Sequence, residues 1–540
     1  MADFLYLGRE TLVETTTAVV TDGDTFTLTA GSTANDKYNY WPCFLKSGNG
    51  IQQNAIVNDY TGGTKTVELY DVFPTTPANG DTIVVGGLSL MDGKSLYVAA
   101  NGMGFTHTGG LVTETYTIRG AATGANLLKF IDALLEMLQQ AREYHQRPQD
   151  AEAIYLYWTT DDEDVDKRSL IYGYEVRNNT FNRTSPFLSN DRAELTVAIT
   201  RMDRWELDTE TSETESNVST FGGWSLVATT PYQQLDSRIH ETQVTLDTGG
   251  SAIGSIWLSL LSTRYNNVAA GGTTFSPIID STEAEAITSA SETGTGGYGT
   301  TYLECTTGSA FVEHGSWQLE DWSGGGNDWR DYRGKFLVLA RMQASVSGDT
   351  HEVYITEVFG GDSVRHESIY VATPDSYTGD SANWHLYPMG EITIPPIEVE
   401  SNLLASSTAG DQYEITFNAQ RVSGSGVLRL DAFLLMPSEY MFWSKGVGLA
   451  VGETLYVRTS PNGVTTTTVE SAGGIIVTVP EYEAEGWAMP RAVGHNFPTS
   501  NAGLILATDG GVGVGQDLND TCDVVFKWYP AYRGYRYDRT

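Results

Sequence analysis

Apolar residues recur with a helical period in one stretch of the chain, whereas most of the remaining sequence alternates apolar and polar residues. The helical stretch carries apolar residues three or four positions apart: Leu127, Ile131, Leu134, Leu138 and Ala141. This spacing places them on one face of an amphipathic helix. Pro148 follows soon afterwards, and a helix does not continue through proline. The pattern therefore predicts one long helix over residues 125–144.

The segments around this helix have the composition of β-strands. Residues 153–158, 169–176 and 193–200 are rich in β-branched and aromatic residues, which favour strands. We therefore expect a β-sheet with the helix packed on it. Similar runs, separated by turns rich in Gly, Asn and Asp, make up most of the rest of the chain. The predicted fold class is mainly β, a multidomain arrangement of β-sandwiches or barrels with one long α-helix.

The length of 540 residues exceeds what one hydrophobic core supports, so several domains are expected. The strand pattern predicts four: a small β module at 1–92, the helix and its sheet at 93–212, a β-sandwich at 213–440, and a C-terminal β domain at 441–540. Residues 208–217 are acidic, rich in Ser and Thr, and nearly free of apolar side chains. This composition predicts a linker between the second and third domains.

The net charge is −36, from 32 Lys and Arg against 68 Asp and Glu. Such an excess repels duplex DNA and anionic membranes, so neither is expected to be bound tightly. No window reaches the length of apolar sequence that a membrane-spanning helix needs, and the first residues lack the pattern of a signal peptide. We expect a soluble protein made in a cytoplasm, and three buried thiols at Cys43, Cys305 and Cys522.

Residues that could carry catalysis do not form a recognisable motif. The eight histidines are scattered, and none has the spacing of a zinc-binding pair. We therefore predict no enzyme activity, no cofactor and no metal. One enzymatic alternative stays open, because the separation of two carboxylates in a glycosidase is a spatial property. Glu313, Glu320 and Asp321 are its candidate residues.

The most acidic run of the chain is Asp161–Arg168, in which Asp162, Asp164 and Asp166 alternate as in a calcium-binding loop. The match fails because such a loop needs glycine at the position that Lys167 occupies. We therefore interpret this run as a solvated hairpin tip.

Tryptophans gather in the predicted sandwich. Trp317, Trp322 and Trp329 lie close together around a glycine-rich segment, and Trp384 follows later. Exposed tryptophans could stack on sugar rings, because a flat apolar ring matches the C–H face of a pyranose. The alternative is that they cover the end of the sandwich or a neighbouring subunit.

Two resemblances concern phage virion proteins. A strand ending at Gly120, a helix, an apolar strand, a strand with a central Gly173, and a strand closing in Thr200–Glu206 together resemble the tail-tube-like domain of phage distal tail and related minor tail proteins. The turns and hairpins of residues 47–81 resemble a module of phage and prophage virion proteins. A third resemblance, at 427–437, is to the last strand of jelly-roll carbohydrate-binding modules.

These resemblances imply a distal-tail or tube-adapter protein carrying an inserted jelly-roll. Such a protein forms a homo-oligomeric ring, of six copies in the family, around the DNA channel and contacts other phage tail proteins. Its location would be the phage tail of the virion, with DNA only as passing cargo. The expected subunit-interface or docking residues lie on the helix, on the closing strand and in the basic, aromatic C-terminal tail: Leu127, Ile131, Trp205, Trp528, Tyr532, Arg533 and Arg536.

Other roles remain open. A receptor-binding or carbohydrate-binding virion protein would use the tryptophans to bind a host-surface glycan. A head-decoration protein or the major tail tube protein would be a variant of the structural role.

Overall fold

A computed structural model of the chain shows two compact units, Met1–Glu210 with Tyr529–Thr540, and Thr211–Trp528. The residues that it describes are 4–48, 51–90, 96–100, 106–108, 111–120, 124–147, 151–159, 166–179, 193–202, 205–227, 238–247, 252–261, 278–281, 284, 286–293, 298, 301–318, 334–346, 348–359, 362–372, 384–394, 413–438, 441–459, 465–471, 473–478, 501–510, 518, 520–529 and 531–532. Strands dominate both units, as the sequence predicts, and one helix is present in the described part.

The first unit is built on a large antiparallel sheet with strand order β2-β5-β4-β3-β6-β1-β10-β11-β12-β9-β7. Its elements are β1 (Phe4–Val20), β2 (Thr25–Leu28), β3 (Pro42–Leu45), β4 (Asn54–Thr61), β5 (Thr66–Leu69), β6 (Thr82–Ser89), β7 (Leu96–Ala100), β8 (Thr106–Thr108), β9 (Leu111–Gly120), α1 (Gly124–Gln146), β10 (Ile154–Thr159), β11 (Lys167–Asn179), β12 (Ala193–Met202), β13 (Trp205–Leu207) and β36 (Ala531–Tyr532).

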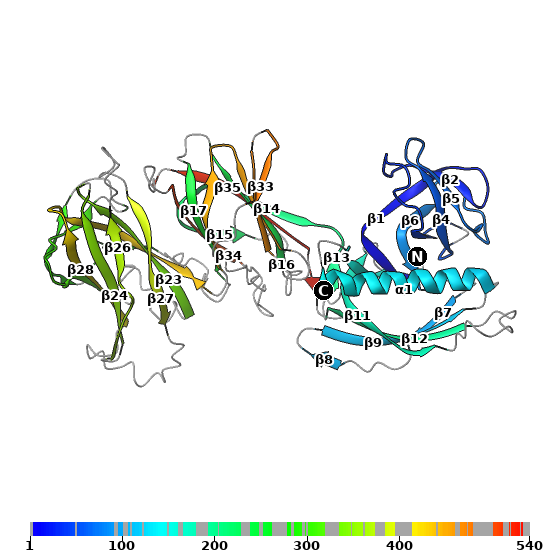
Figure 1. Cartoon of the computed structure of the whole chain (residues 1–540), viewed down its shortest axis with the longest axis horizontal. Coiled ribbons are helices and arrows are strands. Elements are labelled where there is room, and N and C mark those ends of the chain that lie inside the picture. The colour runs from blue at the N-terminus through cyan, green and yellow to red at the C-terminus, as the bar shows by residue number, and fades with distance from the viewer. Residues whose placement is uncertain are drawn as a thin grey trace. The chain divides into compact units, whose positions relative to one another are not determined.

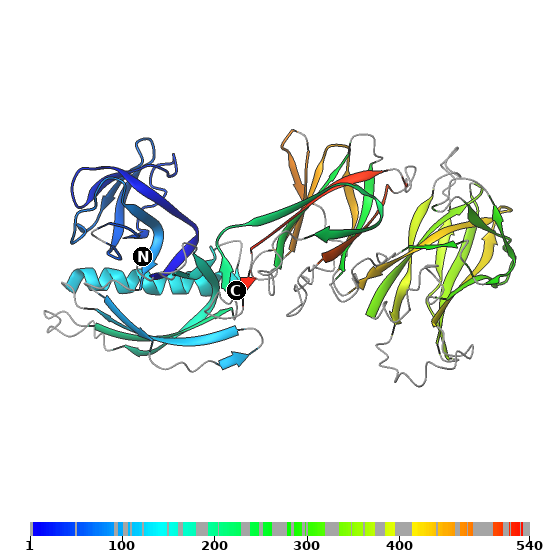
Figure 2. The same ribbon diagram turned by 180° about the vertical axis from the view of Figure 1, so that it is seen from behind.

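The helix α1 confirms the predicted position within two residues at each end. It lies between the N-terminal strands and the sheet that follows (Figure 1), and the view from behind shows the same order (Figure 2). Leu134 and Leu138 are fully buried in a core that contains Leu7 and Leu88 from one side and Val197 from the other. The wide apolar face of the helix is therefore covered from two directions.

The strand β1 joins the predicted first and second domains. Its first half pairs with β10, from Phe4↔Thr159 to Arg9↔Ile154, and its later residues pair with β6 and β2. The predicted boundary at residue 92 therefore does not separate two independent sheets. One long strand serves both, and hydrogen bonding along it holds them together.

The second unit contains two β-sandwiches. One is built from β14 (Thr211–Ser219), β15 (Phe221–Val227), β16 (Arg238–Leu246), β17 (Ile253–Leu261), β30 (Met441–Leu449), β31 (Thr454–Thr459), β32 (Thr465–Glu470), β33 (Ile476–Thr478), β34 (Asn501–Asp509) and β35 (Thr521–Tyr529). Its sheets have the orders β14-β35-β16-β31-β32-β33 and β15-β34-β17-β30.

The other sandwich is inserted between β17 and β30. It comprises β18 (Ile278–Asp280), β19 (Ala286–Ile287), β20 (Ala290–Thr293), β21 (Tyr302–Cys305), β22 (Val312–Gln318), β23 (Gly334–Ala344), β24 (Thr350–Phe359), β25 (Asp362–Arg365), β26 (Ile369–Ala372), β27 (His385–Ile394), β28 (Tyr413–Ser423) and β29 (Leu428–Pro437). Consecutive strands from β22 to β24 and from β27 to β29 alternate between its two sheets, which is the kind of connection found in jelly-rolls.

The predicted domains 213–440 and 441–540 do not match this strand pairing. Residues 211–261 pair with residues 441–529 to form one sandwich, and residues 278–437 form the insertion. Sequence patterns show where strands lie but not which distant strands pair. They therefore predict two continuous domains where the structure has one discontinuous domain.

The predicted linker at 208–217 is a strand over most of its length. β14 begins at Thr211 and pairs with β35, which carries the buried Cys522, Val524 and Phe526. An edge strand can be polar because its backbone hydrogen bonds, and not its own side chains, hold it on the sheet.

The predicted burial of the three thiols is confirmed, since Cys43, Cys305 and Cys522 are all buried and free. Burial raises the pKa of Cys43 to about 12, which leaves its thiol protonated and unreactive at neutral pH. No helix among the described residues is long and apolar enough to cross a membrane.

Candidate functional site

One face of the helix-backed sheet carries a row of threonines. α1 covers one face of β9, β11 and β12, and no described element lies over the opposite face (Figure 1). The side chains that alternate away from the helix on β9 and β12 include Ala198 and five threonines, Thr113, Thr115, Thr117, Thr196 and Thr200, here called the threonine face. Thr117 and Ala198 are buried on it, at 3% and 2% exposed. Hydrogen bonds join them across the strands, at 2.9 Å between the hydroxyls of Thr113 and Thr200 and 3.4 Å between those of Thr117 and Thr196.

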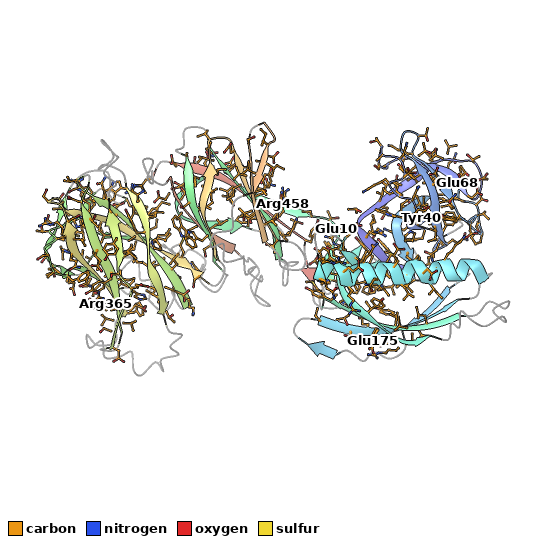
Figure 3. All side chains as sticks on the ribbon, in the orientation of Figure 1. Glu10, Tyr40, Glu68, Glu175, Arg365 and Arg458 are labelled. Carbon is orange, nitrogen blue, oxygen red and sulfur yellow. The ribbon has the colours of Figure 1, made fainter. Side chains whose placement is uncertain are left out.

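The charges on this face compensate each other. Glu175, labelled in Figure 3, forms an ion pair with Arg177 at 3.3 Å, and both side chains are exposed. Arg177 also donates a hydrogen bond to the hydroxyl of Thr115. Among the side chains that the structure describes here, the face is polar and close to neutral, which gives a phosphate backbone little to bind.

A buried ion pair supports the helix side of the same sheet. Arg201 donates to Glu114 at 2.7 Å and lies 4.5 Å above the ring of Trp205. Trp205 is 1% exposed, and Ile131 is buried at 7% on the helix. The side chains of Trp205 and Ile131 therefore lie in the core of their own chain, which leaves them little surface for the predicted subunit interface. The side chain of Leu127 lies outside the described residues.

The C-terminal residues return to the first unit. β36 pairs with β13, placing Tyr532 opposite Trp205, and the guanidinium of Arg168 lies 4.1 Å from the ring of Tyr529. Trp528 is 7% exposed in the core of the β14–β35 sandwich. Trp528 and the backbone of Tyr532 thus make contacts within the chain, and their predicted role in docking stays a prediction. Arg533 and Arg536 lie outside the described residues.

The two described tryptophans of the predicted sugar site, Trp317 and Trp384, do not form a common binding surface. Trp317 is 1% exposed and meets Phe433 edge-on in the core of the inserted sandwich, so it has no free face for a sugar. Trp384 lies 4.8 Å from the guanidinium of Arg341 and packs against Tyr302. Both of these partners belong to the sheet opposite the one that contains Trp317. Trp322 and Trp329 lie outside the described residues. Packing in the core of the inserted sandwich accounts for Trp317.

A different aromatic cluster lies on the outer face of the sheet that contains β24 and β28. The guanidinium of Arg365, labelled in Figure 3, lies 3.9 Å from the ring of Tyr354 and 5.1 Å from that of Phe311. The ring of Tyr354 meets Phe311 edge-on at 4.8 Å. We call Phe311, Tyr354 and Arg365 the arginine stack.

Polar side chains of the neighbouring strands continue this face. Glu352 accepts hydrogen bonds from Ser368 at 2.5 Å and from Gln420 at 2.6 Å, and Tyr370 beside it is 61% exposed. Strand alternation places Tyr354 and Glu352 on the outer side, so this part could have been found from the sequence. The approach of Arg365 to the ring of Tyr354 depends on the pairing of β24 with β25, so it could not have been predicted from the sequence.

The glycosidase candidates are not brought together by the described structure. Glu313 is exposed on β22, whereas Glu320 and Asp321 lie outside the described residues. The same sandwich holds Glu357 between the hydroxyl of Tyr413 and Nε2 of His366, the latter at 2.6 Å. Burial and the bond to Glu357 raise the pKa of Tyr413 well above its usual value, so this phenol stays protonated. No group of metal-binding side chains occurs in the part of the chain that the structure covers.

Comparison with known proteins gives no family. No protein-family model matches the sequence, and no curated protein matches it. Among solved structures, the chain is 10% identical to the infectious bursal virus protein in T=1 particles, with a TM-score of 0.15, covering 60% of this chain and 78% of that one. It is also 10% identical to the exo-β-1,3-galactanase of Phanerochaete chrysosporium solved with galactose, with a TM-score of 0.18, covering 76% and 71%. Likeness at this level supports no argument about function.

Proposed function

We propose that the chain is a structural component of a phage tail, of the distal-tail or tube-adapter type, in which copies of the first unit form a ring around the DNA channel. The observation that carries the proposal is the threonine face, a polar and nearly neutral sheet face over which no described element lies and which α1 backs on the other side. The resemblance of this helix-and-sheet order to tail-tube-like domains supports the same role.

The threonine face suits the wall of a DNA channel. A wall that neutralises many phosphates binds DNA tightly and slows its passage, whereas a polar wall without excess cations does not. Among the described strands, β7 pairs on one side only, with β9; pairing between copies at this edge would protect it within a closed ring.

The mass of the full chain in solution and its negative-stain images test the ring. We expect a closed particle of several copies with an open centre. A monomer, or a compact oligomer without a channel, would contradict the proposal.

The role of the threonine face is tested by adding positive charge to it. The double variant Thr115→Arg and Thr200→Arg should leave the particle mass unchanged but make the particle retain DNA at low salt, because phosphates then find cations in the channel. Thr466→Arg, at an exposed position of β32 in the second unit, is the matched control. Particles of this variant should retain less DNA than those of the double variant. Equal retention by both would argue against a channel wall.

A second candidate function is glycan binding by the inserted sandwich, which the arginine stack and its polar neighbours favour. Aromatic rings and amide or carboxylate side chains on one exposed face are the groups that recognise sugar hydroxyls and C–H faces. Binding of the full chain to cell-surface polysaccharide should weaken at least about 10-fold in Tyr354→Ala. Tyr456→Ala removes a comparable tyrosine under Arg458, at 4.3 Å on β31, and should leave binding unchanged. Absence of binding by the unaltered chain removes this candidate.

A further inference from the structure

A lysine and two carboxylates from distant parts of the chain meet at the junction of the N-terminal strands with the helix-backed sheet. Lys46 follows β3, Glu14 lies on β1, and Asp166 precedes β11. Nζ of Lys46 lies 2.5 Å from Oδ2 of Asp166 and 2.7 Å from Oε2 of Glu14. The side chain of Asp166 is 4% exposed and that of Lys46 is 15% exposed. Asp166 is therefore buried and is not part of a solvated hairpin tip as predicted for residues 161–168, of which 161–165 lie outside the described residues.

Two hydroxyl groups hold the Asp166 carboxyl group in place. The phenol of Tyr6 donates to Oδ2 at 2.7 Å, and the hydroxyl of Thr159 donates to Oδ1. Tyr6 is 1% exposed, and its ring stacks on Tyr157 at 4.7 Å. The amine and the carboxyl group are thus fixed against each other and largely buried, whereas the side chain of Glu14 is 40% exposed.

We propose that Lys46 and Asp166 become joined by an intramolecular isopeptide bond, with Glu14 as the proton shuttle. The reaction is a condensation of an amine with a carboxylic acid and needs no oxidant, nucleotide or other co-reactant. Contact between the two groups replaces the encounter of separate molecules, which in well-oriented systems corresponds to effective concentrations of about 10⁵ M or more.

The protons and bonds balance as follows. The Lys46 ammonium gives one proton to Asp166, which produces a neutral amine and a neutral acid. Nζ then attacks Cγ, and the charge that develops on Oδ1 is stabilised by the Thr159 hydroxyl. Glu14 takes a proton from the nitrogen and delivers it to Oδ2, the Cγ–Oδ2 bond breaks, and one water molecule leaves. The product is one amide, and Glu14 returns to its carboxylate form.

The first proton transfer is expected to limit the rate. Burial favours a neutral Lys46, but Asp166 and Glu14 outweigh it and raise the pKa of the lysine. Bond formation should therefore be slow compared with folding and should run to completion only because the geometry persists in the folded chain.

The other lysine–carboxylate pairs among the described residues lack this combination of contact and burial. Lys129 and Asp71 are 2.9 Å apart with side chains 40% and 39% exposed, and Lys335 and Glu391 are more exposed still. Lys527 contacts Glu241, but that carboxylate also binds Arg458. Although burial opposes it, the bonds from Lys527 and Arg458 lower the pKa of Glu241 to about 2, which makes it a poor acceptor for an amine.

The bond would lie between residues 120 positions apart. It would tie the N-terminal strands covalently to the sheet that carries the threonine face, so that the two could not separate under load. The inference is independent of the proposed tail function, because it depends only on the geometry within the first unit.

Intact-mass measurement of the folded full chain tests the proposal. We expect the protein to be lighter than its sequence mass by one water molecule, and tandem mass spectrometry of a digest to show the peptide with Lys46 linked to the peptide with Asp166. Full sequence mass, or recovery of both residues only in linear peptides, would overturn it.

Variants of the three residues separate their roles. Lys46→Arg keeps the charge but removes the nucleophile, and it should have its full sequence mass. Glu14→Gln keeps both reacting groups and should form the bond about 100-fold more slowly, the loss expected for a general base. Formation at the unaltered rate would exclude Glu14 as the shuttle. Lys129→Arg, the matched control, should still lose one water molecule.

Discussion

Buried charges in the inserted sandwich are held in specific pairs. Arg341 donates to Asp431 at 2.5 Å, and both side chains are almost completely buried. Asp431 sits at an irregularity between β23 and β29 and also accepts a hydrogen bond from the backbone N–H of Tyr298. Burial nevertheless raises the pKa of Asp431 above its usual range. The carboxylate therefore depends on Arg341 to remain ionised inside the protein.

Replacing Arg341 with alanine should lower the free energy of unfolding of the second unit by about 3–5 kcal/mol, because it leaves a buried carboxylate without its cation. Chemical denaturation of the full chain measures this. Lys335→Ala, which breaks the exposed pair with Glu391, is the control and should change stability by less than about 1 kcal/mol. Similar losses in both variants would contradict the argument.

His351 makes stability depend on pH. Burial lowers its pKa to about 4, with Asp349 opposing the shift and Arg421 and His314 adding to it. An unfolded histidine titrates near pH 6.5, so between these values the unfolded chain binds a proton that the folded chain does not. The free energy of unfolding should therefore fall as the pH falls from about 6.5 to about 4.

His351→Gln should reduce this pH dependence, by at most about 1.4 kcal/mol per pH unit. Urea titrations near pH 7 and near pH 5 for both proteins measure it. The glutamine keeps a polar group close to Thr307, which contacts Nδ1 of His351 at 3.1 Å. If the two proteins lose stability equally on acidification, His351 is not the group responsible.

The helix α1 is the element on which the first unit depends most. Its apolar residues contact the sheet on one side and the N-terminal strands on the other, and Lys129 adds an ion pair with Asp71. An amphipathic period fixes which residues face inward, and two covering layers explain why the apolar stripe is so wide.

Leu138→Ala should destabilise the first unit by about 2–5 kcal/mol, because Leu138 is fully buried and its removal leaves a cavity. Glu136→Ala, at an exposed position two residues earlier on the other face of the helix, should change stability by no more than about 0.5 kcal/mol. Thermal unfolding followed by circular dichroism measures both. An equally small effect of Leu138→Ala would mean that this face of the helix is not packed as described.

Taken as a whole, the chain leaves its first unit at Glu210 and returns to it at Tyr529. Each unit has its own hydrophobic clusters, so we expect two transitions in calorimetry and not one.

Two truncations separate the roles of the C-terminal residues. Ending the chain after Tyr529 removes β36 and its pairing with β13, and should lower the stability of the first unit by roughly 1 kcal/mol while leaving the second unchanged. Ending it after Tyr532 keeps β36 but removes Arg533 and Arg536. If assembly is disturbed when the chain ends after Tyr529 but not when it ends after Tyr532, the pairing of β36 with β13 matters for assembly and the predicted docking arginines do not.

Local patterns in the sequence determined the strands, the helix α1 and the buried thiols. The period of Leu134 and Leu138 and the alternation around Val197 depend on neighbours in the chain, so they can be read without knowing the fold. The prediction of β14 as a linker failed because an edge strand needs only backbone partners.

The tertiary structure alone decided which distant strands pair, and with them the division into domains and the sites. Strand pairing joins residues 211–261 to 441–529, and nothing local marks such partners. The same pairing buried Trp317 and Trp205, which the sequence left free to bind a sugar or a neighbour. It also brought Lys46 to Asp166, because the meeting of an amine and a carboxylate across 120 residues is a consequence of packing and not of sequence spacing.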